Sequence, residues 1–126
     1  MSMLAPISAA VFTLLGLLHF YWAAGGGTGK NAAIPEINGV PAFRPSKTAT
    51  VAVGMVLLGT AAIVLLHVKL LLACAAAVLV LRAIGDFRLV GFFKRARDSK
   101  FARMDTLLYS PLCLALGAAL AVLAAS

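Results

Sequence analysis

Four long apolar segments alternate with shorter polar ones along the chain. Each approaches the roughly 20 residues that a helix needs to cross the ~30 Å hydrocarbon core of a bilayer. Backbone groups inside a bilayer must be satisfied within their own segment, so each segment is expected to be helical. The predicted spans cover residues 5–24, 48–66, 70–90 and 105–125. The pattern predicts an all-α, four-helix transmembrane bundle that forms one domain over residues 1–126.

The connections between the spans differ in length and composition. Only residues 67–69 separate the second and third spans, which forces a tight antiparallel hairpin. Residues 25–47 are rich in Gly and Pro, and residues 91–104 are strongly basic. An antiparallel up-down arrangement puts both termini and the short turn at one face, and both long loops at the other.

Lys and Arg residues are distributed unevenly between these two faces. Of the eleven in the chain, Lys69 lies on the face of the termini and Arg82 lies inside the third span. The other nine lie on the face of the long loops: Lys30, Arg44, Lys47, Arg88, Lys94, Arg95, Arg97, Lys100 and Arg103. The positive-inside rule therefore predicts cytoplasmic loops 25–47 and 91–104, with both termini on the non-cytoplasmic side.

Composition supports a membrane protein and argues against several other classes. The chain is 63% hydrophobic and 12% charged, whereas soluble domains carry about 25% charged residues. The net charge of +7 comes mainly from loops beside apolar spans, which favours anionic lipid headgroups over nucleic acid as partners. Cys74 and Cys113 are isolated, and His19 and His67 lie at opposite faces. No metal or cofactor is expected.

Arg82 is the most unusual residue of the third span, and Asp86 follows it one helical turn later. A charge at mid-bilayer costs at least about 2.5 to 3.5 kcal/mol, so it usually has a partner, a cavity or a function. Arg82 and Asp86 share a helix face and are expected to pair. A ligand or catalytic role is the alternative. Snorkelling to the cytosolic interface is disfavoured, because side chains lean toward their helix N-terminus, which here points outward.

Other polar residues collect at the same cytoplasmic end, while the outer halves of the spans are nearly all Ala, Leu, Val and Gly. This pattern favours a polar cavity open to the cytosol. His19, Tyr21 and Trp22 also suit an interfacial anchor, and Asp105 suits a helix N-cap. The candidate ligand-binding residues are His19, Tyr21, Trp22, Arg82, Asp86, Arg88, Asp105 and Tyr109.

The two long loops have distinct predicted roles. Residues 91–104 mix basic and aromatic side chains, as in segments that lie on an anionic membrane surface. Five residues are expected at lipid headgroups, or else at a ligand phosphate or carboxylate: Lys94, Arg95, Arg97, Lys100 and Arg103. Residues 25–30, GGGTGK, lack the full phosphate-binding pattern. The apolar remainder of that loop predicts a lid or a short interfacial hairpin.

The fourth span carries two further signals. A helix that starts near Asp105 is expected to kink at Pro111, since a start at Pro111 would leave too few residues to cross the bilayer. Gly117, Ala121 and Ala125 form a ridge of small residues. Such ridges serve either packing within the chain or self-association, so the sequence is also compatible with a homo-oligomer.

Three stretches carry a family resemblance: HFYWAAGGG at residues 19–27, GDFRLVGFFKR at 85–95 and FARMDTLLYSPLC at 101–113. Together they resemble an uncharacterised bacterial family of small four-span integral membrane proteins, a domain of unknown function. The resemblance covers nearly the whole chain. It implies a four-helix architecture, a multi-pass protein of the bacterial inner (plasma) membrane, and no known activity.

Three classes of function remain compatible with these patterns. The favoured one is binding or transport of an anionic or amphipathic small molecule or lipid in a cytosol-facing cavity, with Arg82 and Arg88 as counter-charges. An intramembrane enzyme acting on a lipid or isoprenoid-like substrate is the second, using His19, Asp86, Asp105 or Tyr109 as acid-base groups. The third is a structural or accessory membrane subunit, whose charges only fix helix register.

Overall fold

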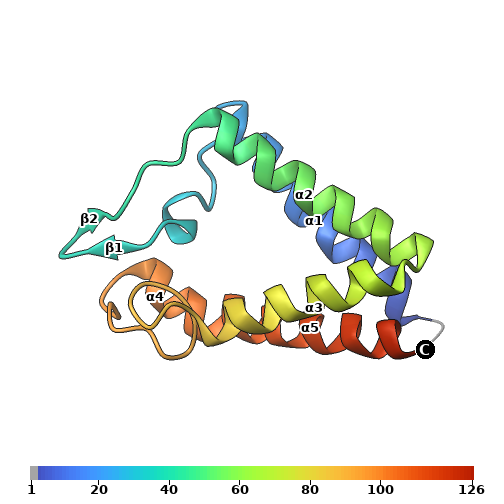
Figure 1. The fold of residues 1–126 in the computed structure, drawn as a ribbon. Helices are drawn as coiled ribbons and strands as arrows, with labels where there is room; N and C mark the ends of the chain where they lie inside the picture. The colour runs from blue at the N-terminus through green and yellow to red at the C-terminus, as the bar shows by residue number, and fades with distance from the viewer. Residues whose placement is uncertain (1–2) are drawn as a thin grey trace.

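Two antiparallel pairs of helices form the framework of the molecule (Figure 1). The computed structural model describes residues 3–126. The elements are α1 (Leu4–Ala23), η1 (Asn31–Ala33), β1 (Glu36–Ile37), β2 (Val40–Pro41), α2 (Lys47–Leu66), α3 (Lys69–Ile84), α4 (Lys100–Met104), η2 (Asp105–Tyr109) and α5 (Ser110–Ala125). η2 is a π-helical turn that joins α4 and α5 into one continuous helix.

Helix α1 packs along α2, and α3 packs along α5. The two pairs meet near the start of α1 and the end of α5, and they diverge toward the long loops (Figure 1). The buried core lies where they meet and consists of Ala9, Phe12, Ala61, Val64, Leu72, Ala76, Leu116, Leu120 and Leu123. The four long helices therefore share a core at one end, rather than along their whole length as in a regular bundle.

Within residues 3–126, three helices are long and apolar enough to cross a membrane: Leu4–Ala23, Lys47–Leu66 and Lys100–Ala125. The third predicted span, 70–90, is wrong at its end, because α3 stops at Ile84. Gly85 follows with φ +92°, a backbone conformation that leaves the helix and suits glycine. The 16 residues of α3 extend about 24 Å, less than the ~30 Å hydrocarbon core.

The last helix differs from its prediction at its beginning. It starts at Lys100, where the Ser99 hydroxyl accepts a hydrogen bond from the N–H of Ala102 at 2.9 Å. The π-helical turn η2 ends at Tyr109, two residues before Pro111, whose missing N–H would interrupt a regular helical ladder. The irregularity expected around this proline is therefore a widened turn.

Short turns connect the remaining elements. His67 adopts a left-handed conformation, φ 55° and ψ 51°, which ends α2 and turns the chain into α3. Within loop 25–47, Glu36 pairs with Pro41 and Ile37 with Val40 across a two-residue turn. The turn residues Asn38 and Gly39 both have positive φ, as the tightest hairpin turns require. A hairpin is thus present in the loop for which a lid or a hairpin was predicted.

Small residues allow close approach within each helix pair. A Cβ added at Gly54 would lie 3.1 Å from the backbone oxygen of Gly16 and 3.2 Å from the ring of Phe20. In the other pair, a Cβ on Gly117 would lie 3.0 Å from a methyl carbon of Val80. Gly117, the first residue of the predicted small-residue ridge, therefore serves packing within the chain. Self-association through Ala121 and Ala125 stays a prediction.

Replacing Gly54 with Leu should separate α1 from α2. We expect Gly54→Leu to lower the free energy of unfolding by about 1–3 kcal/mol, the usual cost of overpacking. The measurement is denaturant-induced loss of helical circular dichroism in detergent micelles. Gly59→Leu on the same helix is the matched control, because a Cβ there meets nothing within 4 Å. Equal stability of the two variants would contradict the packing argument.

Candidate functional site

The carboxylate of Asp105 is the centre of a buried ion-pair cluster. Its side chain is inaccessible to solvent. Arg82 Nη2 lies 2.8 Å from Oδ1, and Lys94 Nζ lies 3.1 Å from Oδ2. The backbone N–H of Gly91 donates to Oδ2 at 2.7 Å, and the Ser110 hydroxyl donates to Oδ1 at 3.1 Å. One carboxylate therefore ties together α3, the loop after it and the last helix.

Local backbone features bring these groups together. The widened turn η2 places Ser110 within reach of the carboxylate five residues earlier. The loop after α3 folds back tightly: the Phe92 N–H donates to the Ala83 carbonyl at 2.8 Å. A Cβ on Gly85 would lie 1.9 Å from the Val90 oxygen, and one on Gly91 would lie 2.3 Å from the Ile84 oxygen. Only glycine fits at these two positions.

The expected pairing of Arg82 with Asp86 is wrong. Because α3 ends before Asp86, the two side chains do not share a helix face. Asp86 Oδ1 instead accepts hydrogen bonds from the N–H groups of Arg88, Leu89 and Val90, at 2.9, 2.8 and 3.2 Å. Asp86 thus organises the turn of the loop, and Arg82 pairs across to the last helix.

The predicted headgroup role of Lys94 is also wrong. Lys94 is 2% exposed, and its ammonium group donates to the Gly91 carbonyl at 3.0 Å and to the Thr106 hydroxyl. The basic sequence around Lys94 does not indicate that this residue is buried. Arg97 bonds the carbonyls of Lys94 and Phe92 at 3.1 and 3.0 Å. Contact of exposed Arg95, Lys100 and Arg103 with headgroups stays a prediction.

The cluster combines two cations with one carboxylate, and it holds three segments of chain in place. Arg82 has 30% of its side chain exposed, and its Nη1 has no hydrogen-bond partner among residues 3–126. Within the same residues no group of three side chains is arranged to hold a metal ion. The geometry gives Asp105, Arg82 and Lys94 a structural role.

A second polar group closes the end of α1. The Trp22 indole N–H donates to the Thr28 carbonyl at 2.8 Å, and the Tyr21 hydroxyl donates to the Thr28 hydroxyl at 3.1 Å. These bonds hold the glycine-rich turn after α1, in which Gly26 leaves room for the Tyr21 ring. The Trp22 indole is also edge-on to the His19 ring, with centroids 5.0 Å apart.

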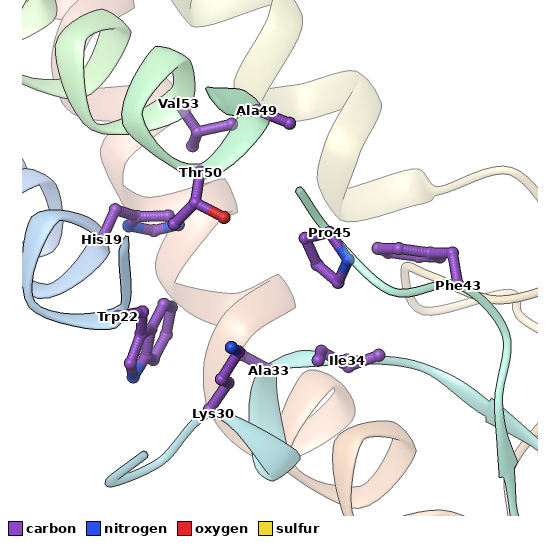
Figure 2. A pocket seen from close by; sticks show the side chains of 10 residues that line it. All are labelled: His19, Trp22, Lys30, Ala33, Ile34, Phe43, Pro45, Ala49, Thr50 and Val53. Carbon is purple, nitrogen blue, oxygen red and sulfur yellow. The ribbon is translucent and has the colours of Figure 1, made fainter. Parts of the chain in front are cut away.

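A pocket of about 330 Å³ lies beside this group, between α1, α2 and loop 25–47 (Figure 2). We call it the His19 pocket. Its walls are mostly apolar and are formed by His19, Trp22, Lys30, Ala33, Ile34, Phe43, Pro45, Ala49, Thr50 and Val53. Of the eight predicted ligand-binding residues, only His19 and Trp22 line it. The other lining residues escaped prediction, because the path of the long loop cannot be read from local patterns.

The tautomer of His19 follows from its hydrogen bond. His19 Nδ1 lies 2.7 Å from the Leu15 carbonyl oxygen, which can only accept, so Nδ1 carries a proton. In the neutral ring, Nε2 then carries the lone pair. Figure 2 shows the imidazole and the Thr50 hydroxyl at the same end of the pocket, with Lys30 nearer the loop.

Tyr109 connects the two halves of the molecule. Its hydroxyl donates to the Ala32 carbonyl at 2.9 Å, which fixes η1 against the last helix. Its ring is 5.7 Å from that of the buried Phe101. Tyr109 therefore positions the loop segment that carries Ala33 and Ile34 along the wall of the His19 pocket. It does not itself line the pocket.

The chain is therefore mostly helical and contains helices long enough to span a membrane. Residues 12–120 match the family model described as a protein of unknown function (DUF3995). The match covers most of the 126 residues, so the chain belongs to this family. No curated protein and no solved structure matches the chain.

Removing the charge of Asp105 should destabilise the protein strongly. We expect Asp105→Asn to lower the free energy of unfolding by about 3–5 kcal/mol, because Lys94 and Arg82 would lose their counter-charge. Urea-induced unfolding in detergent micelles would measure this change in the free energy of unfolding. Asp98→Asn is the matched control, since Asp98 is exposed and has no hydrogen bond within residues 3–126. A loss below about 1 kcal/mol for Asp105→Asn would contradict a structural role.

Asp86 should add a pH-dependent contribution to stability. The backbone N–H groups of Leu89 and Arg88 hold the pKa of the exposed Asp86 carboxyl below its usual value. A lowered pKa stabilises the folded state at pH values above the unfolded-state pKa of about 3.9, and this gain disappears as pH falls through the folded-state pKa. The free energy of unfolding of wild type should therefore exceed that of Asp86→Ala by the full amount at pH 6, and this difference should shrink below about pH 4. An equal gap at pH 6 and pH 3 would refute this.

Proposed function

We propose that the chain is a multi-pass inner-membrane protein that binds an anionic amphipathic small molecule or lipid in the His19 pocket. The observation that carries this proposal is an apolar hollow with one cation in its wall. About 330 Å³ is near the lower end of small-molecule pockets, which fits a short amphiphile or the polar end of a lipid.

The chemistry of the lining defines the proposed ligand. The Lys30 side chain has no hydrogen bond or ion pair within residues 3–126, so its ammonium group is free to meet a carboxylate or phosphate. His19 offers Nε2 and Thr50 its hydroxyl as further polar partners. Val53, Ile34 and Phe43 supply apolar contact for a hydrocarbon chain.

The proposed membrane placement rests on three helices of spanning length and on charge. We propose that α3 completes a fourth pass, with the cluster of Asp105 lying at its inner end. Helix α3 is too short to cross the bilayer completely, and Arg82 in its last turn is neutralised by the carboxylate of Asp105. The His19 pocket is lined by one of the two long loops, and these two loops together carry nine of the eleven Lys and Arg residues, which supports a cytoplasmic location for the pocket.

The site differs from the one expected around Arg82. Asp105 already neutralises that guanidinium, and Arg88 lies on a different loop from the pocket wall. The proposed acid-base groups of an enzyme are also dispersed. His19 lies in the pocket, Asp86 caps a turn, Asp105 is enclosed by cations, and Tyr109 is bonded to Ala32. Binding is therefore the function that this geometry supports best.

Trp22 provides a direct test, because it is the chain's single tryptophan and lines the pocket. Dodecyl phosphate added to the protein in phosphatidylcholine nanodiscs should change Trp22 fluorescence in a saturable way. Dodecanol, which lacks the charge, should bind more weakly. Lys30→Gln should weaken dodecyl phosphate binding about fivefold, as expected for one partly exposed charged contact.

Two further variants make this test specific. Val53→Phe should fill the pocket and abolish the saturable change, with the helical circular dichroism retained. Lys47→Gln removes the same charge outside the pocket and should bind as wild type does. Absence of saturation, or equal effects of Lys30→Gln and Lys47→Gln, would overturn the proposal.

A further inference from the structure

A second hollow, of about 410 Å³, lies between the β1–β2 hairpin and the loop that follows α3. We call it the hairpin groove. Figure 1 shows both segments at the loop end of the molecule, far from the start of α1 and the end of α5. Its walls carry four charged side chains: Glu36 from β1, and Arg88, Arg95 and Asp98 from the loop. It shares no lining residue with the His19 pocket.

The backbone under the two arginines is held by hydrogen bonds. The Arg88 carbonyl accepts from the N–H groups of Arg95 and Ala96, at 3.1 and 2.9 Å. The Asp86 carboxylate fixes the turn at the start of the same loop. Arg88 and Arg95 therefore leave the backbone from neighbouring, bonded positions.

The four charged side chains of the groove are not paired with one another. Within residues 3–126, none of Arg88, Arg95, Glu36 and Asp98 has a side-chain hydrogen bond or ion pair. The other basic side chains of this loop behave differently, since Lys94 and Arg97 are both engaged with carbonyl groups. The groove thus presents two guanidinium groups and two carboxylates whose bonding capacity is unused.

The balance of charge selects the class of ligand. Two cations and two anions sum to zero, so a simple anion would meet repulsion from the carboxylates as well as attraction from the arginines. A ligand with both a phosphate and an amine satisfies both sets. Guanidinium groups match phosphate oxygens in forked hydrogen bonds, and an ammonium group donates to carboxylates.

We propose that the hairpin groove binds a phosphoethanolamine group. Arg88 and Arg95 hold its phosphate, and Glu36 and Asp98 hold its ammonium group. The group is supplied by a phosphatidylethanolamine headgroup or by a free phosphoethanolamine compound. A trimethylammonium group lacks N–H donors, so phosphatidylcholine should bind less well. This site does not depend on the ligand of the His19 pocket.

Native mass spectrometry of the full chain in detergent tests the proposal. Dioleoyl phosphatidylethanolamine, phosphatidylglycerol and phosphatidylcholine are added at equal concentrations, and the bound fraction is measured for each. Wild type should retain phosphatidylethanolamine at least about fivefold better than the other two. Arg88→Gln with Arg95→Gln should abolish this preference and lower the retention of all phospholipids at the site.

A second double variant tests amine recognition. Glu36→Gln with Asp98→Asn should keep phosphatidylglycerol bound while losing the preference for phosphatidylethanolamine. The matched control, Lys100→Gln with Arg103→Gln, removes two exposed charges on α4 outside the groove and should leave the preference unchanged. Circular dichroism melts should show that all variants are folded, because the replaced side chains make no hydrogen bonds or ion pairs within residues 3–126.

The outcomes that would overturn the proposal are specific. Equal loss in the Lys100 and Arg103 control would show general surface attraction. An unchanged preference after Glu36→Gln with Asp98→Asn would show that the carboxylates do not recognise the amine. If wild type does prefer phosphatidylethanolamine, competition with free O-phosphoethanolamine shows whether the site binds the headgroup alone or the intact lipid. Displacement shows that the headgroup alone suffices, and its failure identifies the intact lipid as the ligand.

Discussion

The arrangement of the loop end depends on one buried carboxylate. Asp105 accepts from Arg82, Lys94, Gly91 and Ser110 at once, so the end of α3, the folded loop and the last helix are held by a single group. Without Asp105, the buried Lys94 and the partly buried Arg82 would lose their counter-charge, and an unpaired buried charge is costly. The cluster explains how a chain with so many apolar residues tolerates Arg82 within an apolar helix.

The two proposed sites are lined by different residues, although loop 25–47 contributes to both. The His19 pocket belongs to α1, α2 and the first long loop, and the hairpin groove lies between that loop and the second. Tyr109 reaches from the anchored helix to Ala32 and so connects the two loops to the same support. The framework of helices meets only at the other end, which leaves the loop end to be built from hydrogen bonds and short turns.

Much of the helical framework could be predicted from the sequence, because length and apolar composition decide which segments form membrane-type helices. The sites could not be predicted as well. Arg82 was expected to pair locally, and its true partner lies 23 residues away, across a turn that Gly85 and Gly91 make possible. Two glycines flanking DFRLV were the available signal for that tight loop. The burial of Lys94 and the path of residues 25–47 had no local signal, since both depend on contacts between distant segments.

The π-helical turn at Asp105–Tyr109 also sets the rotational phase of the last helix. Asp105 and Gly117 are twelve positions apart, and at about 100° per residue a regular helix would point them about 120° apart. One extra residue accommodated in the widened turn removes about 100° of that difference. Asp105 can then meet Arg82 while Gly117 meets Val80, with both facing α3. If the turn were regular α-helix with the same number of residues, the anchor and the close helix contact would lie on different sides of the last helix.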